Sequence, residues 1–322
     1  MVTVNDLGTT WNLPNYAGEL FTADAMQTPL LAMIGGLSGG RQTTNFEFPT
    51  AVLFDYPEAA QPEISESASA VAPAAVMPAR EQETNVVQIH QEVVNLTYAK
   101  QSNSGRMSGM NTAGEINGVA DERAFQVQHK LIKIARDVEH SFINGRYQKS
   151  TGSTVANRTR GMLELCEEGN IIDAAGAALS KDLLQQLFRM MAESGAYFTN
   201  MVMFLPAVQK QKLSDIYAAQ MGGSLIYTPS QRKVGGVNIT EIETDFCRLG
   251  VCWDRFMPEG SVLVADVAHL APVFQAVPGK GVLFEEELAK TGAADKIQIY
   301  GQIGLAHGPA FLHGAIVGLA SN

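Results

Sequence analysis

Lysine is absent from the first 99 residues of this 322-residue chain. That stretch holds two arginines, Arg41 and Arg80, against eleven Asp and Glu, so its net charge is −9, close to the formal −10 of the whole chain. Residues 100–160 then carry ten Lys and Arg against five acids. Because net charge governs association and solubility rather than fold, an acidic segment followed by a locally basic one indicates contact with partners or with other copies of the chain.

Cysteine is also scarce. Cys166, Cys247 and Cys252 form neither a set of close pairs nor the spacing of a zinc knuckle, so we expect reduced thiols and synthesis in a cytosol. The six histidines never reach the H-x-x-x-H spacing of a helical metal site, and no glycine-rich loop has the spacing of a phosphate cradle. The sequence therefore predicts no metal, no cofactor and no enzyme activity.

Long apolar runs are missing as well. The most apolar stretch, residues 303–320, is interrupted by His307, Gly308, Pro309 and His313, which are costly in a bilayer, so we predict no membrane span. Residues 1–13 are polar with scattered hydrophobic side chains, unlike a secretory leader. The remaining composition, 46% hydrophobic and 17% charged, is typical of a globular chain long enough for about two domains.

The acidic segment contains signs of an arm and a hairpin. A short helical portion is expected over residues 15–33, broken at Thr28-Pro29 and closed by Gly35 and Gly36, and the alternation around Phe46 and Phe48 predicts a strand. Residues 84–99 are rich in β-branched residues and could return beside that strand. Between them, residues 57–80 have either the composition of a disordered linker or the tip of a long projecting hairpin. Since an isolated hairpin is marginal in water, such a projection would need a neighbour to lie on.

The strongest secondary-structure signal is an amphipathic helix over residues 121–146, about 40 Å long at 1.5 Å per residue. One half of its wheel is apolar. The other half carries basic residues, which the nearby acids Asp121, Glu122, Asp137 and Glu139 almost balance. We interpret this half as a solvated face with little capacity for specific nucleic-acid binding, although it could lie near packaged nucleic acid.

The second half of the sequence predicts mixed helices and strands. Helices are expected to open at Ser180, a plausible N-cap, and at Pro206. Strands are expected over residues 236–243, 249–253, 261–265, 282–286 and 296–305, and a final strand over 310–319 is expected to pair with the one before it.

This order of elements resembles that of the major capsid proteins of tailed bacteriophages, which have the Hong Kong 97-type fold. The motifs that carry the resemblance are Thr28-Pro29-Leu30-Leu31, Phe46-Glu47-Phe48, Arg136-Asp137-Val138-Glu139, Asn170-Ile171-Ile172-Asp173-Ala174, Thr244-Asp245-Phe246, Arg255-Phe256-Met257-Pro258, Leu288-Ala289-Lys290-Thr291-Gly292 and Leu312-His313. The resemblance implies an α+β fold. It divides the chain into an N-terminal arm (1–40), an E-loop hairpin (41–101), a P-domain with the spine helix (102–165), a region that is mainly A-domain with some P-domain strands (166–295) and closing strands (296–322).

The resemblance implies a structural protein of the virion. Copies of the chain, as pentamers and hexamers, would form an icosahedral shell around double-stranded DNA, with the hairpin of one subunit across its neighbour. Expected partners are a separate scaffolding protein, a portal and, as an optional addition, a decoration protein. The candidate intersubunit contacts are Glu58, Glu63, Ile64, Glu66 and Arg80. The candidate lumen-facing polar residues are Lys130, Lys133 and Arg136.

Some members of this fold join subunits by an isopeptide bond from an E-loop lysine. No lysine precedes Lys100 here, so we predict a noncovalent shell. Two alternatives stay open from the sequence: a cellular nanocompartment shell of the same fold, and a soluble α+β enzyme.

Overall fold

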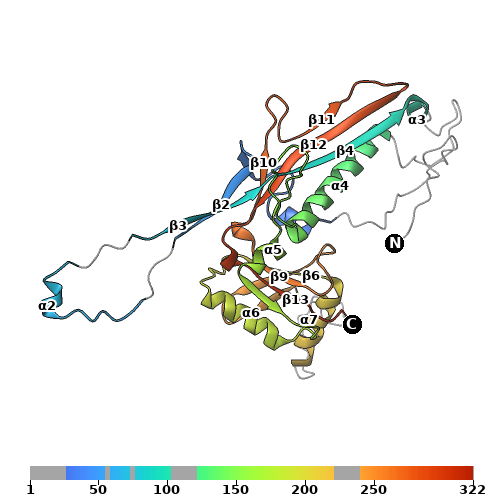
Figure 1. The fold of residues 1–322 in the computed structure, drawn as a ribbon. Helices are drawn as coiled ribbons and strands as arrows, with labels where there is room; N and C mark the ends of the chain where they lie inside the picture. Colours follow the sequence, from blue (N-terminus) through green and yellow to red (C-terminus); the bar gives the residue numbers. More distant parts are fainter. Residues whose placement is uncertain (1–26, 55–58, 73–76, 103–121, 221–239, 322) are drawn as a thin grey trace.

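The computed structural model describes residues 27–54, 59–72, 77–102, 122–220 and 240–321. Two units, each with its own sheet and helices, stack end to end, and a long hairpin projects from near their junction (Figure 1). The chain combines helices with sheets whose strands pair mostly antiparallel, which confirms the α+β class. No helix in these ranges is long and apolar enough to cross a bilayer.

The first unit is a five-stranded sheet arranged around one long strand, β12. Its strands are β1 (Arg41–Thr43), β4 (Gln88–Thr97), β10 (Ala271–Gln275), β11 (Leu283–Glu287) and β12 (Ala294–Ala306). β12 pairs antiparallel with β4, from Ala294 opposite Thr97 to Ile303 opposite Gln88, and it also pairs with β11 and β10. β1 extends the sheet by pairing parallel with β10.

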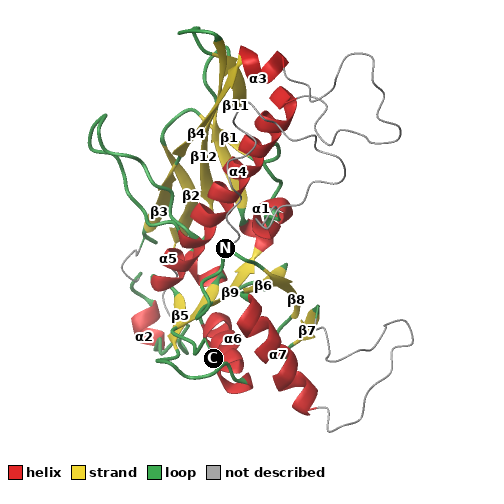
Figure 2. Cartoon of the chain, turned by 90° about the vertical axis from the view of Figure 1, so that its right-hand side faces the viewer, coloured by secondary structure: helices red, strands yellow, loops and turns green. Residues whose placement is uncertain are grey.

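Helix α4 (Glu122–Asn144) lies along this sheet and packs on β4 and β12 (Figures 1 and 2). The helix predicted over residues 121–146 is thereby confirmed to within two residues at each end. Its side chains Ile134, Val138, Phe142 and Ile143 are buried, as the apolar half of the helical wheel predicts. They enter the same core as Ile299 and Ile303 of β12, while α3 (Tyr98–Ser102) follows β4 at the far end of the sheet.

Two glycines allow the end of α4 and the start of the next helix to approach each other closely. The amide of Gly161 donates to the carbonyl of Gly145 at 3.0 Å. A Cβ on Gly145 would lie 2.5 Å from the Thr159 oxygen, and a Cβ on Gly161 would lie 2.5 Å from the Gly145 nitrogen. Because no side chain tolerates such distances, both positions require glycine. Gly161 is the N-cap residue of this next helix, α5 (Met162–Glu167).

The second unit is a six-stranded sheet in the order β5-β13-β9-β6-β8-β7. Its strands are β5 (Asn170–Asp173), β6 (Met201–Leu205), β7 (Glu241–Glu243), β8 (Arg248–Trp253), β9 (Val262–Asp266) and β13 (Gly314–Val317). β6 and β9 are buried along their whole length. A second hydrophobic core therefore forms here, separate from the core beneath α4.

Both helices predicted for this unit are present. Helix α6 (Lys181–Glu193) begins after Ser180, whose hydroxyl accepts a hydrogen bond from the Leu183 amide at 3.3 Å, so the predicted N-cap is confirmed. Its buried side chains Leu184, Leu187 and Phe188 pack toward the sheet. Helix α7 (Ala207–Gln220) begins one residue after Pro206, as expected.

The hairpin is formed by β2 (Glu47–Phe54) and β3 (Arg80–Val86), with a four-residue helix, α2 (Glu66–Ser69), at its outer end (Figure 1). The strands pair antiparallel from Glu47 opposite Val86 to Phe54 opposite Arg80, with an irregularity between Pro49 and Ala51. The strands on either side of residues 57–80 thus pair, as the hairpin interpretation predicts. Only β3 returns beside β2, however, because after Val87 the chain continues as β4 and changes its partner to β12.

The prediction for the final strand was wrong. β13 pairs with β5 and β9 in the second sheet, not with β12, because residues 307–313 carry the chain from one unit to the other through a short 3-10 turn. The Asn170 amide holds this crossing by donating to the carbonyls of Phe311 and His313 at 2.9 and 3.0 Å. The range 296–322 expected as closing strands is therefore divided between the two sheets.

Other elements differ at their ends or were missed. The arm helix α1 (Pro29–Met33) starts at a proline that we expected to break it, since proline suits the first helical turn. The helical portion expected over 15–26, and the strand portion over 236–239, lie outside the described residues. The other predicted strands coincide with β7, β8, β9, β11 and β12 to within a few residues. β1, β5, β6 and β10 were not predicted.

Candidate intersubunit surfaces

The hairpin tip presents side chains that are not packed against the rest of the chain. All described residues from 59 to 80 are exposed, and Ile64 is 67% exposed. An isolated exposed apolar residue is ordinary, but a whole excursion of this length without packing is not. The hairpin therefore has the geometry of a segment that is completed by a partner.

The structure gathers some of the candidate contacts and separates others. Glu63, Ile64 and Glu66 lie at or beside α2, where the Ser65 hydroxyl caps the helix by accepting from the Ala68 amide at 3.2 Å. Arg80 instead begins β3, opposite Phe54, and β3 lies closer to the body of the molecule than α2 does (Figure 1). Glu58 lies outside the described residues. Three acidic or apolar groups thus share the outer end, and the arginine does not.

The base of the hairpin is fixed by a buried asparagine that sequence reasoning did not select. Asn85 is 0% exposed. Its Nδ2 donates to the Leu305 carbonyl at 2.8 Å, and its Oδ1 accepts from the amides of Val86 and Arg160, each at 2.8 Å. One side chain therefore joins β3, β12 and the segment before α5. The signal in the sequence was a polar residue just before two valines on a β-branched stretch.

Apolar packing also fixes the base of the hairpin. Phe48 of β2 and Val87 are buried with Val273 and Ala306 in a small cluster of their own. Gly304 of β12 admits the Phe48 ring, since a Cβ there would lie 2.8 Å from the ring and 2.8 Å from the Val86 oxygen. The hairpin is thus firmly rooted even though its tip is not packed.

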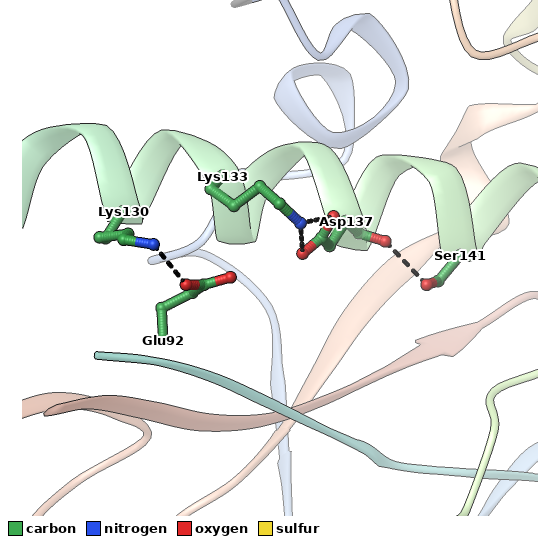
Figure 3. A network of polar contacts seen from close by, with 5 residues as sticks. All are labelled: Glu92, Lys130, Lys133, Asp137 and Ser141. Atoms are coloured by element: carbon green, nitrogen blue, oxygen red, sulfur yellow. Dashed lines mark hydrogen bonds and ion pairs between the residues drawn. The ribbon is translucent and has the colours of Figure 1, made fainter. Parts of the chain in front are cut away.

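The predicted polar face of α4 is largely occupied by ion pairs within the chain (Figure 3). Lys130 points toward β4, and its Nζ lies 2.8 Å from Oε2 of Glu92. Lys133 pairs with Asp137 one turn later on the helix, and the Asp137 carbonyl accepts from the Ser141 hydroxyl at 2.7 Å. Arg136 is half-buried. Two of the three candidate lumen-facing cations are therefore already neutralised by partners of the same chain.

The grouping of Glu139 with the solvated acids of α4 was wrong. Glu139 is 0% exposed, and its two carboxyl oxygens accept from the backbone amides of Leu30 and Leu31 at 2.8 and 2.7 Å. Burial, together with the nearby carboxyl of Asp254, raises the pKa of Glu139 to about 8. Contact with the arm helix, more than 100 residues away in sequence, explains why an acid sits beside the apolar half of the wheel.

The buried histidines His307 and His313 form hydrogen bonds with the backbone. Nδ1 of His313 accepts from the Asp266 amide at 3.2 Å, and its Nε2 donates to the His307 carbonyl at 2.7 Å. Burial lowers the pKa of both His307 and His313 to about 4, so both rings are neutral at pH 7. Within the described ranges, no group of three or more His, Cys, Asp or Glu side chains could hold a metal ion. These rings serve the chain crossing between the two sheets.

Comparison with known proteins gives one family and a set of similar folds. The family model described as "SU10 major capsid protein" matches residues 3–320. A search of curated proteins found no match. Among solved structures, the capsid asymmetric unit of cyanophage A-1(L) is 9% identical with a TM-score of 0.69, and the alignment covers 99% of this chain and 100% of that one.

Two further structures share the fold. The capsid of an empty GTA particle is 11% identical with a TM-score of 0.61, covering 99% of this chain and 100% of that chain. The SrpI encapsulin of Synechococcus elongatus PCC 7942 is 10% identical with a TM-score of 0.57, and the alignment covers 100% of this chain and 98% of that chain. The Hong Kong 97-type fold expected from the sequence is thus confirmed. At these sequence identities the similarity to solved structures shows the fold alone.

Proposed function

Because the chain belongs to the SU10 major capsid protein family, it is a capsid shell protein, and we propose that its copies close into an icosahedral shell held by noncovalent contacts. The observation that supports this proposal is the rooted hairpin with an unpacked tip. A repeated contact between a projection on one subunit and a different surface on the next generates rings, as pentamers and hexamers require.

The test is electron microscopy of the purified protein under assembly conditions. Closed hollow particles are expected. A small monodisperse oligomer under all conditions tried would contradict the proposal and would favour the soluble-enzyme alternative.

We assign the parts of the structure to those of the fold as follows. Residues 1–40 are the N-terminal arm, and residues 41–101 are the E-loop hairpin. Helix α4 is the spine helix of the P-domain, which also includes the five-stranded sheet. The six-stranded sheet with α6 and α7 is the A-domain.

The hairpin of one subunit would lie across its neighbour. Its acidic tip would meet a basic surface of the next copy, either within residues 100–160 or in the second unit, since residues 1–99, which include the hairpin, carry a net charge of −9 against −10 for the whole chain. Reversing Glu58, Glu63 and Glu66 to lysine should lower the yield of closed particles. Glu193→Lys, at the exposed end of α6, is the matched control. Equal yields from both variants would show that this charge contact does not matter.

The subunits would be joined without covalent bonds. An isopeptide bond needs a lysine amine, and no lysine occurs before Lys100. Denatured particles should therefore run on a gel as a single band at the chain mass of 34.6 kDa. A ladder of higher masses would contradict this proposal.

The shell would enclose double-stranded DNA and would be made in the cytoplasm of a bacterial host. With Lys130 and Lys133 paired inside the chain, α4 offers little positive charge, so contact with DNA would be weak and independent of sequence. Assembly would also use a separate scaffolding protein, a portal and, as an optional addition, a decoration protein. Nuclease-resistant DNA in particles from host cells is expected. A protein cargo instead would support the nanocompartment alternative, whose fold is the same.

A further inference from the structure

The short arm helix α1 is capped by a side chain that belongs to another part of the chain. The N-cap residue Thr28 makes no side-chain hydrogen bond, and Pro29 has no amide hydrogen to offer. The next two amides, of Leu30 and Leu31, are buried and would be costly without acceptors. Glu139 of α4 supplies both acceptors at 2.8 and 2.7 Å. One carboxyl group of α4 therefore accepts both of these amide hydrogens of α1.

A second buried carboxyl lies against the first. Asp254 follows β8 and is 0% exposed. Its amide donates to the Leu205 carbonyl at 2.9 Å, and its Oδ1 accepts from the Phe256 amide at 2.8 Å. Within the described residues, Oδ2 meets no N–H or hydroxyl donor, and its neighbour is the carboxyl of Glu139. Two carboxyl groups can hydrogen-bond only if one of them carries a proton.

Among the described residues, no cation contributes to the pKa shift of either carboxyl. Helix α1 has no titratable side chain, and Arg255 beside Asp254 is exposed. On α4, Arg136 is half-buried and His140 is exposed. Two more titratable groups are nearby: Cys252 of β8, on which both carboxyls act, and Lys210 of α7, which interacts with Cys252. Burial raises the pKa of the Cys252 thiol, which keeps it neutral, and burial lowers the pKa of Lys210.

We propose that Glu139 and Asp254 share a single proton, and that this proton latches the arm helix α1 onto α4 and the end of β8. With the proton in place, Glu139 donates to Asp254 and still accepts both amides of α1. Without it, two adjacent carboxylates are buried in a site of low polarity, where their repulsion is strong. Separation of the elements that carry or contact them, with release of α1, relieves that repulsion.

The same geometry sets the direction of the pH effect. Burial and the field of Asp254 favour the protonated form of Glu139, whose pKa is raised to about 8, and burial raises the pKa of Asp254 as well. The latch is therefore closed at neutral pH and opens in mildly alkaline solution. Because it depends on contacts within one chain, it does not require the proposed shell.

Hydrogen exchange on the full-length unassembled protein tests the latch. The exchange of a peptide that contains Leu30 and Leu31 is followed by mass spectrometry between pH 6 and 9.5 and corrected for the intrinsic pH dependence of exchange. In the native chain, the opening constant should rise above about pH 8, approaching tenfold per pH unit, as the loss of one proton requires.

Three variants complete the experiment. In Glu139→Gln the side chain cannot lose a proton and can still donate to Asp254, so the corrected profile should be flat. Asp254→Asn removes the anion and should also suppress the alkaline opening. Asp137→Asn, exposed on the same helix, should behave like the native chain. A flat native profile, or a Glu139→Gln profile as steep as the native one, would overturn the proposal. If either carboxyl variant fails to fold, the native profile and the other variant still decide.

Discussion

The contribution of Asn85 to the hairpin base can be tested by the substitution Asn85→Ala. The side chain is fully buried and makes three bonds of 2.8 Å, to the Leu305 carbonyl and to the amides of Val86 and Arg160. Alanine is compatible with the strand, but it cannot form any of these three hydrogen bonds. The change isolates the polar contacts from the apolar packing of Phe48 nearby.

The magnitude follows from the groups left behind. A typical hydrogen bond contributes about 1 kcal/mol net, and a buried group without a partner costs about 1–3 kcal/mol. The Leu305 carbonyl and the Arg160 amide both lose their asparagine partner, so we expect the free energy of unfolding to fall by about 3 kcal/mol. At about 1.4 kcal/mol per tenfold change, the population of molecules with an open hairpin base should rise roughly 150-fold.

Two measurements check this expectation. Urea unfolding of the unassembled chain gives the change in free energy, and hydrogen exchange of β3 reports whether the opening is local. Asn95→Ala is the matched control because Asn95 is exposed on the neighbouring strand β4, and it should stay within about 0.5 kcal/mol of the native value. If Asn85→Ala changes stability no more than this control, the argument from buried hydrogen bonds is refuted.

Three further predictions concern single positions. Ser180→Ala removes the cap of α6 and should lower the free energy of unfolding by about 1 kcal/mol in urea titrations; an unchanged midpoint would show that the cap is dispensable. Gly304→Ala forces a methyl group against the Phe48 ring and should lower the free energy of unfolding by about 1–3 kcal/mol. Gly292→Ala, with open space around its Cβ, should leave the free energy of unfolding nearly unchanged, and equal effects of the two substitutions would contradict the close-approach argument. Burial lowers the pKa of His313 to about 4, below its ordinary 6.5, so the unfolded chain binds this proton more readily than the folded chain. The contribution of neutral His313 to the free energy of unfolding is therefore complete above about pH 6.5 and is lost as the pH falls toward 4. His313→Gln should flatten that acid slope in urea midpoints between pH 4 and 7.5, and an unchanged slope would assign it to other groups.

The sequence was most informative where local pattern alone decides structure. The period of α4 was visible because its apolar residues recur at helical spacing, and α6 was visible from its capping serine. By contrast, β6 is a short run of apolar residues buried on both faces, so it shows no alternation. β1 has only three residues and is defined by its pairing with β10. Such strands are specified by their neighbours, which a single sequence does not reveal.

The candidate surfaces show the same limit. The hairpin and its exposed tip could be predicted from the Pro- and Ala-rich stretch between two strand patterns. The position of Glu139 beside the apolar half of the wheel also could have suggested burial, but the charge of its side chain indicated exposure to solvent. What decides its place is a pair of amides on α1, 109 and 108 residues away. The change of partner at Val87 likewise depends on β12, about two hundred residues further along the chain.

That change of partner has a mechanical consequence. β3 and β4 run on almost without interruption, so a pull on the tip of the hairpin is transmitted along the axis of β4 (Figure 1). β4 is held to β12 by a ladder of ten register positions that lies parallel to this pull. The ladder is therefore loaded in shear, with all its hydrogen bonds sharing the force, instead of being unzipped one bond at a time. A subunit tethered through its hairpin can bear tension from a neighbour without its own sheet peeling apart.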